Sequence, residues 1–291
     1  MHMFMFLFLI LCQLMTTSCQ VKKSQANQES VGQKIDVRVY YIRHGLSCGN
    51  IASYYAELTL QDPALTESGL DNSHKVGGLF HDYLKQQNIN LDFVGSSPLM
   101  RAKQTLLQML PQEIEANGDN LYEVAYLGEN TDFIPKAWQL SNKPEDVSVQ
   151  EQKLARYFPN MIRHKMNLTY SEGAIRDEVN YDLFRTSTLP KIIKDLRDKN
   201  EKTTYHMAIV THSVTMKDEL NCVRNPQEFF GELPTNNEIY YIDYSYDLGN
   251  QTTLLAESSC VRAIAVEPSY KGNNDVASCN RLIDPSRKKA N

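Results

Sequence analysis

The chain has 291 residues, of which 42% are hydrophobic and 22% charged, a composition typical of a globular protein with one large or two small domains. Its 35 acidic residues outnumber 30 Lys and Arg residues, and the net charge of -5 gives no indication of nucleic-acid binding through overall electrostatics. A protein of this charge that binds an anion must concentrate positive charge at a local site.

Residues 3–15 form an apolar block that is too short for a membrane-spanning helix, which takes roughly 20 residues. Small residues follow at 16–19, so we predict a secretory signal peptide over 1–19 and a polar, flexible leader over 20–34. The mature protein is then secreted, outside the cytoplasm. Because no Lys or Arg precedes the block, an uncleaved membrane anchor and a lipoprotein signal ending at Cys19 stay open as alternatives. Contact with a membrane is expected only if the segment is not removed.

Cleavage at or beyond Cys19 leaves four cysteines, an even number that favours two disulfides in a secreted chain. Three pairings exist, and nearness in the sequence favours Cys260 with Cys279, which leaves Cys48 with Cys222. Four free or buried thiols are the alternative. Because no C-x-x-C or H-x-x-x-H spacing occurs, we expect no zinc site, and no metal or other cofactor.

The rest of the chain alternates apolar strands with helical segments. Strands are predicted at 35–42, 91–94, 122–127, 206–211, 238–243 and 260–266. Helices are predicted at 47–57, 66–87, 98–110, 146–165, 180–198 and from 212 to about 220. This order predicts an α/β fold, a three-layer sandwich in which helices cover both faces of a mainly parallel central sheet. We expect one domain over 35–270, with 130–180 as an elaboration that covers the substrate and 271–291 as a loosely ordered tail.

Four polar segments each end a predicted strand or open the helix that follows it. They are Arg-His-Gly-Leu-Ser-Cys-Gly-Asn at 43–50, Ser-Ser-Pro-Leu-Met-Arg-Ala-Lys-Gln-Thr at 96–105, Tyr-Leu-Gly-Glu at 126–129 and Val-Thr-His-Ser at 210–213. The carboxyl ends of strands in such a sheet gather at one edge, where ligands bind. A histidine beside an arginine at this edge combines a nucleophile with an anion clamp, which indicates chemistry on phosphate.

Three of these motifs, R-H-G-x-S-x-x-N, S-x-x-R-A-x-Q-T and V-T-H-S, each follow an apolar strand. In this order they resemble the histidine phosphatase superfamily, also called the phosphoglycerate mutase-like superfamily. The resemblance extends over most of 35–266 and implies a phosphoglycerate mutase-like fold. Thr66-Glu-Ser-Gly69 also resembles the family's L-T-x-x-G, and we interpret it as a helix start without a role in the reaction.

The resemblance implies a role for each of five residues. His44 would attack phosphorus and carry the phosphoryl group as phosphohistidine, since neutral imidazole is a nucleophile near neutral pH. Arg43 and Arg101 would bind the non-bridging oxygens, because a guanidinium presents paired donors that match phosphate. His212 would add a further donor. Glu129 matches the family's acid and would donate a proton to the leaving oxygen.

Further residues near these motifs have weaker assignments. By the same resemblance Ser47 and Asn50 would contact phosphate or substrate, with helix capping as the alternative. Gly45 is expected to keep side chains away from the phosphate, and Lys103 to be exposed to solvent.

Two acidic residues compete with Glu129 for the role of proton donor: Glu123, inside a predicted strand, and Asp132, in the following loop. Trp138 and Tyr170 are candidates for the substrate pocket, with ordinary packing as the alternative.

The sequence thus predicts a secreted phosphatase that hydrolyses a phosphomonoester through phosphohistidine on His44. No metal would be needed, because arginine and histidine form the charge clamp. The substrate would be a small phosphorylated molecule whose identity stays open. The alternatives are a phosphoglycerate mutase-type phosphotransferase and a noncatalytic phosphate-binding protein. A secretory signal and the lack of a dense basic cluster in 130–180 argue against the mutase.

Overall fold

The computed structural model describes residues 34–51, 60–129, 140–158, 165–176, 178–222, 233–248, 252–255, 260–266, 275–276 and 279. The strands are β1 (Lys34–Arg43), β2 (Phe93–Ser96), β3 (Asn120–Val124), β4 (Lys165–Tyr170), β5 (Thr204–Thr211), β6 (Ile239–Asp247), β7 (Thr252–Leu255) and β8 (Val261–Ile264). The α-helices are α2 (Cys48–Ile51), α4 (Glu67–Gln86), α5 (Met100–Met109), α6 (Pro111–Ala116), α7 (Val147–Tyr157), α8 (Tyr181–Leu183) and α9 (Leu189–Lys199). A 3₁₀ turn, η2 (Leu140–Asn142), and two π-helical turns, η4 (Phe184–Thr188) and η5 (Thr215–Glu219), complete the described elements.

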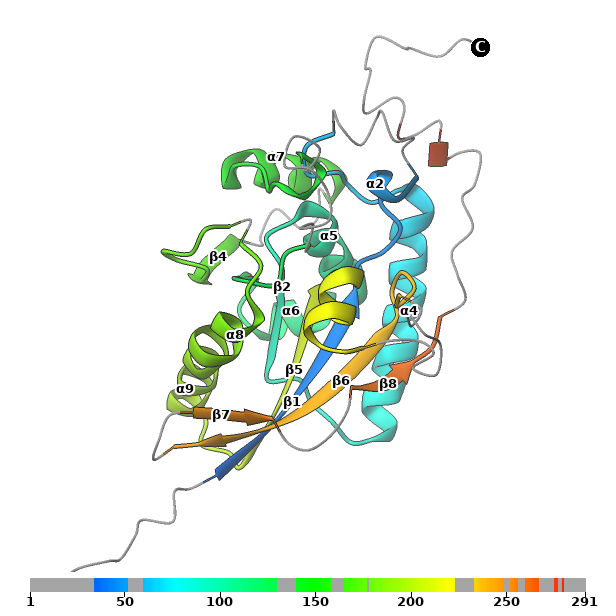
Figure 1. Cartoon of the computed structure of the whole chain (residues 1–291). Coiled ribbons are helices and arrows are strands. Elements are labelled where there is room, and N and C mark those ends of the chain that lie inside the picture. The colour runs from blue at the N-terminus through cyan, green and yellow to red at the C-terminus, as the bar shows by residue number, and fades with distance from the viewer. Residues whose placement is uncertain are drawn as a thin grey trace, which may run out of the picture.

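In the described part of the chain, one eight-stranded sheet has the order β4-β3-β2-β5-β1-β6-β7, with β8 paired to β6 (Figure 1). The five strands from β4 to β1 run parallel to one another. β6 runs antiparallel to β1, and β7 and β8 run antiparallel to β6. The predicted mainly parallel sheet is therefore confirmed, with an antiparallel edge, a common feature of large α/β sheets.

The two central strands are buried on both faces where they approach the motifs. All residues of β1 from Val39 to Ile42 are buried, and so are those of β5 from Met207 to Thr211. Helices cover both faces of this part of the sheet, so both sets of alternating side chains must be apolar. The strands lie side by side in parallel, with Arg43 opposite Thr211. They therefore deliver the residues that follow them to the same point of the sheet edge.

Two hydrophobic cores lie on opposite faces of the sheet, which confirms the three-layer architecture. Tyr41 belongs to one core and its neighbour Tyr40 to the other, because successive side chains of a strand point to opposite faces. Helices α4, α5, α6 and α7 contribute to the core that contains Tyr40, whereas α8, η4, α9 and η5 contribute to the core that contains Tyr41. The site-bearing ends of β1 and β5 thus lie between two packed helical layers.

Helix α4 begins as the sequence predicts, and its glycine pair has a packing explanation. The hydroxyl of Thr66 accepts a hydrogen bond from the Gly69 N–H at 2.9 Å, which caps the first turn. A Cβ on Gly77 would lie 2.5 Å from the backbone oxygen of Met109, so glycine permits α4 to approach α5 closely. Gly78 faces open space.

Several predicted boundaries are wrong for identifiable reasons. The helix expected at 146–165 ends at Tyr157, and β4 follows and extends the sheet beyond β3. The strand expected at 122–127 ends at Val124, and Tyr126 has the left-handed φ of 67°. Pro111 begins a separate helix, α6, because proline is favoured at the first position of a helix. Of the helix expected at 47–57, residues 52–57 lie outside the described residues.

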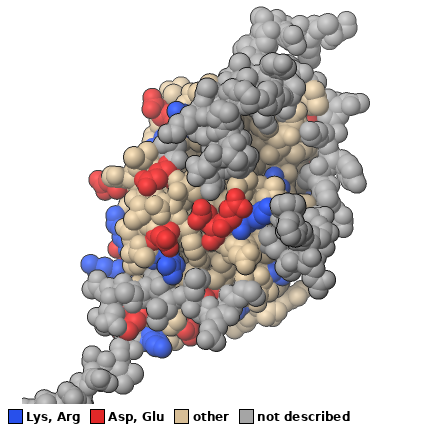
Figure 2. Space-filling model, in the orientation of Figure 1, with Lys and Arg blue, Asp and Glu red and all other residues tan. Residues whose placement is uncertain are grey.

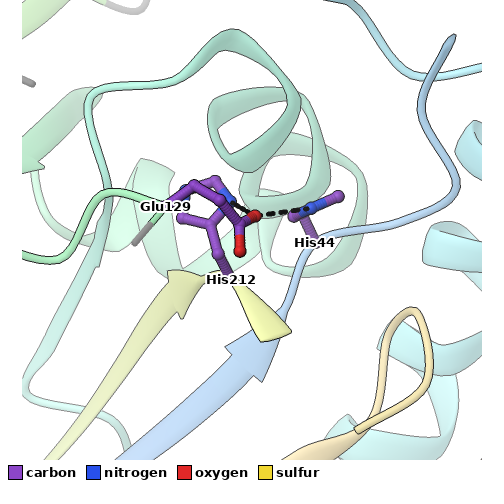
Figure 3. A group of neighbouring side chains, drawn as sticks. All are labelled: His44, Glu129 and His212. Atoms are coloured by element: carbon purple, nitrogen blue, oxygen red, sulfur yellow. Dashed lines mark ion pairs between the residues drawn. The ribbon is translucent and has the colours of Figure 1, made fainter. Parts of the chain in front are cut away.

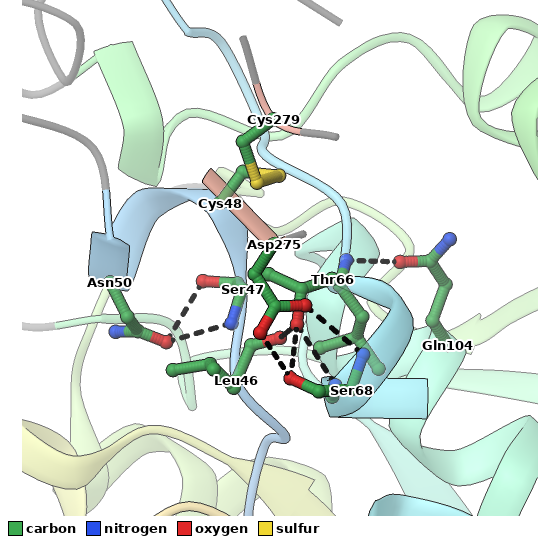
Figure 4. Close-up of a disulfide and its surroundings, with 11 residues drawn as sticks. Leu46, Ser47, Cys48, Asn50, Thr66, Ser68, Gln104, Asp275 and Cys279 are labelled. Carbon is green, nitrogen blue, oxygen red and sulfur yellow. Dashed lines mark hydrogen bonds between the residues drawn. A yellow bond between two sulfur atoms is a disulfide. The ribbon is translucent and has the colours of Figure 1, made fainter. Parts of the chain in front are cut away.

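The predicted disulfide pairing is wrong, although two disulfides form. Cys48 pairs with Cys279 across a sequence separation of 231 (Figure 4), and Cys222 pairs with Cys260 across 38. Nearness in the sequence misled the prediction because pairing depends on where the fold places each Cβ, with Cα atoms here 5.4 and 5.2 Å apart.

The stretch 271–291, expected to be loosely ordered, contributes three described residues. Two of them are held against the domain: Asp275 accepts hydrogen bonds from the backbone and hydroxyl of Ser68, and Cys279 forms its disulfide (Figure 4). The predicted signal peptide and the leader up to residue 33 lie outside the described residues, while Lys34 already belongs to β1. Within the described ranges, no helix has the length and apolar character to cross a bilayer.

Candidate active site

The residues that follow β1 and β5 meet at the carboxyl edge of the sheet. His44 continues from β1, and its N–H donates to the Thr211 carbonyl at 3.0 Å, so the backbone pairing of the two strands extends to the motif. His212 continues from β5, and the ring centroids of the two histidines lie 5.0 Å apart (Figure 3). Both side chains are buried. Two motifs 168 positions apart in the chain therefore form one site, as the sequence predicts.

His44 is held in the tautomer that a nucleophile requires. Its Nδ1 lies 2.7 Å from the Gly45 carbonyl oxygen, which can only accept, so Nδ1 carries the proton. Nε2 is then unprotonated, and its lone pair accepts a hydrogen bond from Arg101 Nε at 3.2 Å. Burial, followed by the positive charge of Arg101 and its neighbours, holds the pKa of His44 well below 6.5. The ring is thus neutral at neutral pH, with Nε2 available for attack.

His212 and Glu129 form the second half of the site. His212 Nδ1 faces a carboxylate oxygen of Glu129 at 3.2 Å, and its Nε2 lies 2.6 Å from the Ser97 hydroxyl (Figure 3). Burial is the largest cause of the lowered pKa of His212, and Arg101 lowers it further while Glu129 opposes the shift. Burial thus favours the neutral ring, whose Nδ1 lies beside the carboxylate without a hydrogen bond of ordinary geometry among the described residues.

Glu129 is ionised despite its burial. Burial alone would raise the pKa of its carboxyl, but His212, Arg101 and Arg43 together outweigh this effect and lower the pKa to about 2. One of its oxygens lies 3.5 Å from Arg101 Nη2 and 3.9 Å from His44 Nε2. The carboxylate thus occupies a position among cations where a phosphate group would experience the same attraction.

The positive charge of this region is concentrated in the guanidinium groups of Arg101, which is buried, and Arg43, which is partly buried. Arg101 is 4% exposed and projects from the first turn of α5. Arg43 donates through Nη1 to the Pro234 carbonyl, while its buried Nε has no hydrogen-bond partner in the described part of the chain. Burial lowers the pKa of both groups, and Glu129 opposes that shift. Over the face shown in Figure 2, by contrast, basic side chains lie interspersed with acidic and neutral ones.

In comparisons with known proteins, the chain matches solved structures at low similarity. No family model and no curated protein matches the chain. Among solved structures, ecdysone phosphate phosphatase from Bombix mori matches at 13% identity over 81% of this chain and 97% of the other, with a TM-score of 0.45. Phosphoglycerate mutase from Bacillus anthracis matches at 16% identity over 78% and 94%, with a TM-score of 0.40. Phosphoserine phosphatase from Entamoeba histolytica matches at 17% identity over 77% and 96%, with a TM-score of 0.35.

These proteins are members of the histidine phosphatase superfamily. The superfamily is the one that the three motifs resemble. At such identities and TM-scores, the likeness carries no activity or substrate over to this chain.

Ser47 and Asn50 of the histidine phosphatase-like motif bond to each other. Both the N–H and the hydroxyl of Ser47 donate to Asn50 Oδ1 at 3.0 Å (Figure 4). Asn236 lies beside them and donates through Nδ2 to the His44 carbonyl at 2.9 Å. Among the described residues, no hydrogen bond joins Ser47 or Asn50 to the His44 ring, and their contact with phosphate stays a prediction.

Gly45 is required for packing against α4. A Cβ at this position would lie 2.5 Å from the Ser73 hydroxyl and 3.0 Å from the Gly69 carbonyl oxygen. We expected glycine here to leave space for the phosphate, but the two nearest atoms that a Cβ would meet in this structure belong to α4.

The competing acid Glu123 is engaged elsewhere. Its buried carboxylate pairs with Lys103 at 2.8 Å and with Arg176 at 2.6 Å, and this pairing outweighs burial to lower its pKa to about 2. The expectation that Lys103 is exposed is wrong, because its ammonium is fully buried with Glu123 and Gln150 as acceptors. Asp132 lies outside the described residues.

Of the two aromatic candidates for the pocket, only Tyr170 lies among the described residues. Tyr170 lies on β4 and packs against Tyr122 and Phe93, with its hydroxyl 3.0 Å from Asp195. This is the packing alternative. Trp138 lies outside the described residues.

Sequence reasoning missed two acceptors that hold Arg101. The Ser141 carbonyl accepts from Nη1, and Asn142 Oδ1 accepts from Nη2, both at 2.9 Å. They belong to η2, inside the stretch 130–180 whose sequence shows neither clear periodicity nor a motif. A short polar turn of this kind gives no signal by which it could be assigned to a site.

Three donor groups of the site could in principle hold a metal ion. Ligand atoms of His44, Glu129 and His212 all lie within 4.8 Å of one another. A cation at this point would also lie beside the Arg101 guanidinium, whose Nε is 3.2 Å from His44 Nε2. Because like charges repel strongly in a buried site, the arrangement suits an anion better than a metal ion.

Proposed function

We propose that this chain is a phosphatase of the histidine phosphatase superfamily that hydrolyses a phosphomonoester through phosphohistidine at His44. The observation that carries the proposal is the state of the His44 ring: buried, neutral and fixed with its Nε2 lone pair beside Arg101. A neutral imidazole next to a buried guanidinium is suited to attack an anionic phosphorus centre.

In the first step, the Nε2 lone pair forms a bond to phosphorus while the bond from phosphorus to the ester oxygen breaks. The His44 ring becomes positively charged as this bond forms, and the Nδ1–H bond to the Gly45 carbonyl stabilises that charge. Arg43, Arg101 and His212 bind the non-bridging oxygens, where negative charge is held throughout the transfer. In the second step, water attacks phosphorus, the bond to Nε2 breaks, and free phosphate and neutral His44 are restored.

Glu129 provides the proton for the leaving oxygen and accepts one from the attacking water in the second step. A carboxyl with a pKa of about 2 is ionised before substrate binds. A bound phosphate brings further negative charge beside the same two groups, His212 and Arg101, and therefore raises the pKa of Glu129. Substrate binding thus prepares the acid, which in comparable enzymes contributes roughly 10²–10⁴-fold to the rate.

We also propose that the enzyme needs no metal ion and works outside the cytoplasm. The guanidinium groups of Arg43 and Arg101 near His44 support the first statement, since they supply the positive charge that a metal would otherwise bring. Two disulfides support the second, because disulfides persist in oxidising compartments. Removal of the segment 1–19 is part of this proposal and would be read from the N-terminus of the secreted protein.

Hydrolysis of p-nitrophenyl phosphate tests the proposal. We expect activity in wild type that EDTA does not reduce, and a loss of at least about 10³-fold in His44→Ala, because the covalent route disappears. The matched control is His81→Ala, an exposed histidine on α4, which should retain wild-type activity. Acid-quenched wild type should carry an acid-labile phosphoryl group that His44→Ala lacks.

Three outcomes would contradict the proposal in different ways. Equal rates in wild type and His44→Ala would refute catalysis at this residue. Conversion of phosphoglycerate isomers far faster than phosphate release would establish a mutase. Tungstate binding without turnover of any phosphomonoester would indicate a noncatalytic phosphate-binding protein.

A further inference from the structure

Arg101 is oriented from two directions, and both depend on other parts of the chain. Its backbone lies in the first turn of α5, directly after Met100. Its guanidinium is held by the Ser141 carbonyl and by Asn142 Oδ1, which belong to η2. The angle at which Arg101 meets His44 therefore requires that α5 and η2 keep a fixed spacing.

One buried carboxylate joins these two elements. Asp62 Oδ1 accepts a hydrogen bond from the Met100 N–H at 2.7 Å, and its Oδ2 accepts from the Glu145 N–H at 3.1 Å. Glu145 follows Asn142 by three positions, so the second bond anchors the segment that contains η2. The same side chain thus contacts the residue before Arg101 and the segment that holds its guanidinium.

The start of α5 depends on this contact. Leu99, at the N-cap position, has no side chain able to accept a hydrogen bond, and α5 has no side-chain cap of its own. Asp62 supplies the acceptor from a segment 38 residues earlier in the chain. A carboxylate at this position also interacts favourably with the positive end of the helix dipole.

The backbone and burial of Asp62 show that the fold holds it in place. The residue is fully buried and has φ of 46°, a left-handed conformation that non-glycine residues seldom adopt. Gln150 Nε2 donates to Oδ2, and Gln150 Oε1 accepts from the buried Lys103 ammonium. Arg176 donates to the Glu145 carbonyl, so the same buried network also holds the partner segment from the other side.

We propose that Asp62 is a positioning residue that sets the geometry of Arg101 toward the phosphate, through Met100 on one side and the η2 segment on the other. The inference rests on the proposed function for its catalytic readout. Asp62 does not contact the phosphate itself, and it acts only through Arg101. If Asp62 no longer held this geometry, Arg101 would shift, and oxyanion binding and turnover would both weaken. A displacement of about 1 Å in an active site can lower the rate about 10²-fold.

The variant Asp62→Asn tests this inference at nearly constant volume. The amide keeps one acceptor oxygen, and its NH2 group takes the place of the other. That NH2 group then faces the N–H of either Met100 or Glu145, so the hydrogen bond to that residue is lost. We expect kcat/KM for p-nitrophenyl phosphate to fall roughly 10–100-fold and the Kd of tungstate, measured by calorimetry, to rise by about 10-fold or more.

The matched control is Asp92→Asn. Asp92 is also a largely buried aspartate, and it accepts from the His206 N–H at 2.9 Å near the amino end of β5, away from His212. Both variants should lower the melting temperature. Only Asp62→Asn should lower kcat/KM and tungstate affinity, both measured at a temperature where circular dichroism shows each variant folded.

The variant Asn142→Ala provides a second test that does not disturb the buried core, because Asn142 is only half-buried. It should reduce kcat/KM in the same direction. In the double variant with Asp62→Asn, the combined loss should be smaller than the product of the single losses, since both act through Arg101.

The inference is overturned if folded Asp62→Asn binds tungstate and turns over substrate as wild type does, or if Asp92→Asn loses as much. Fully multiplicative losses in the double variant would also overturn it. If wild type binds tungstate but hydrolyses no phosphomonoester, the proposed function fails, and the tungstate affinities alone decide the role of Asp62. If wild type binds no tungstate, both proposals fall.

Discussion

Replacement of Glu129 by glutamine should separate binding of the phosphate from its transfer. The carboxylate shares His212 and Arg101 with any bound phosphate, and it is ionised in the free site. A substrate therefore meets a fixed negative charge beside the cations that bind it. Glu129→Gln removes this charge and leaves the cations in place, so oxyanions should bind more tightly although the proton donor is lost.

The structure gives the scale of both effects. The fall of the Glu129 pKa from 4.5 to about 2 corresponds to roughly 3 kcal/mol in favour of the ionised carboxylate. Repulsion between two unit charges about 5 Å apart is of the same order, about 3 kcal/mol at an effective dielectric constant of 20. Even half of this value corresponds to more than a tenfold change in affinity. We expect tungstate to bind Glu129→Gln about 10–100-fold more tightly at pH 7, and kcat to fall about 10²–10⁴-fold.

Calorimetric titration with tungstate, beside steady-state hydrolysis of p-nitrophenyl phosphate, measures the two effects. Glu115→Gln, an exposed glutamate on α6, is the matched control and should change neither quantity. The wild-type affinity should rise as the pH falls, because bound oxyanion raises the pKa of Glu129 and binding takes up a proton. This dependence should be weaker in Glu129→Gln. Weaker tungstate binding in the variant, or an unchanged kcat, would refute the reasoning.

Two further predictions concern the disulfides and the pH profile. Removal of the Cys48–Cys279 bridge by paired serines should lower the free energy of unfolding by about 1.6 kcal/mol more than removal of Cys222–Cys260, from loop-closure entropy at separations of 231 and 38. Urea titration measures the difference, and the reverse order would contradict it. Loss of the first bridge should also lower kcat/KM, because Cys48 lies only four positions after His44, and unchanged activity in the paired-serine variant would contradict this. In the proposed mechanism neutral His44 is the nucleophile, and burial with Arg101 lowers its pKa, so the acid limb of kcat/KM should lie below pH 6.5. An NMR titration of His44 at or above 6.5 would disprove this.

The central part of the fold could be predicted because its signals are local. The runs before Arg43 and His212 are apolar over their whole length, as strands covered on both faces must be. Residues that end neighbouring parallel strands meet at one edge, so the convergence of His44 with His212 follows from topology alone. Thr66 likewise marks a helix start through a bond to a residue three positions away.

Other features depended on partners distant in the chain. The sequence of β6 does not indicate that it pairs antiparallel to β1, since the connection that decides its direction lies outside the strand. Lys103 looks like a surface residue until β3 supplies Glu123 as its partner. Charged side chains are buried only when compensated, and that compensation comes from other elements.

The sequence by itself determined the candidates for the nucleophile, His44, and for the anion clamp, Arg43 and Arg101. It also determined the layered sheet that brings them together, because strand burial and helix capping depend on residues that are neighbours in the chain. The tertiary structure alone decided which cysteines pair, and which distant segments bring Asp62 to Met100 and Asn142 to Arg101. Those contacts join segments that follow no common periodicity, and their geometry exists only once the layers have packed.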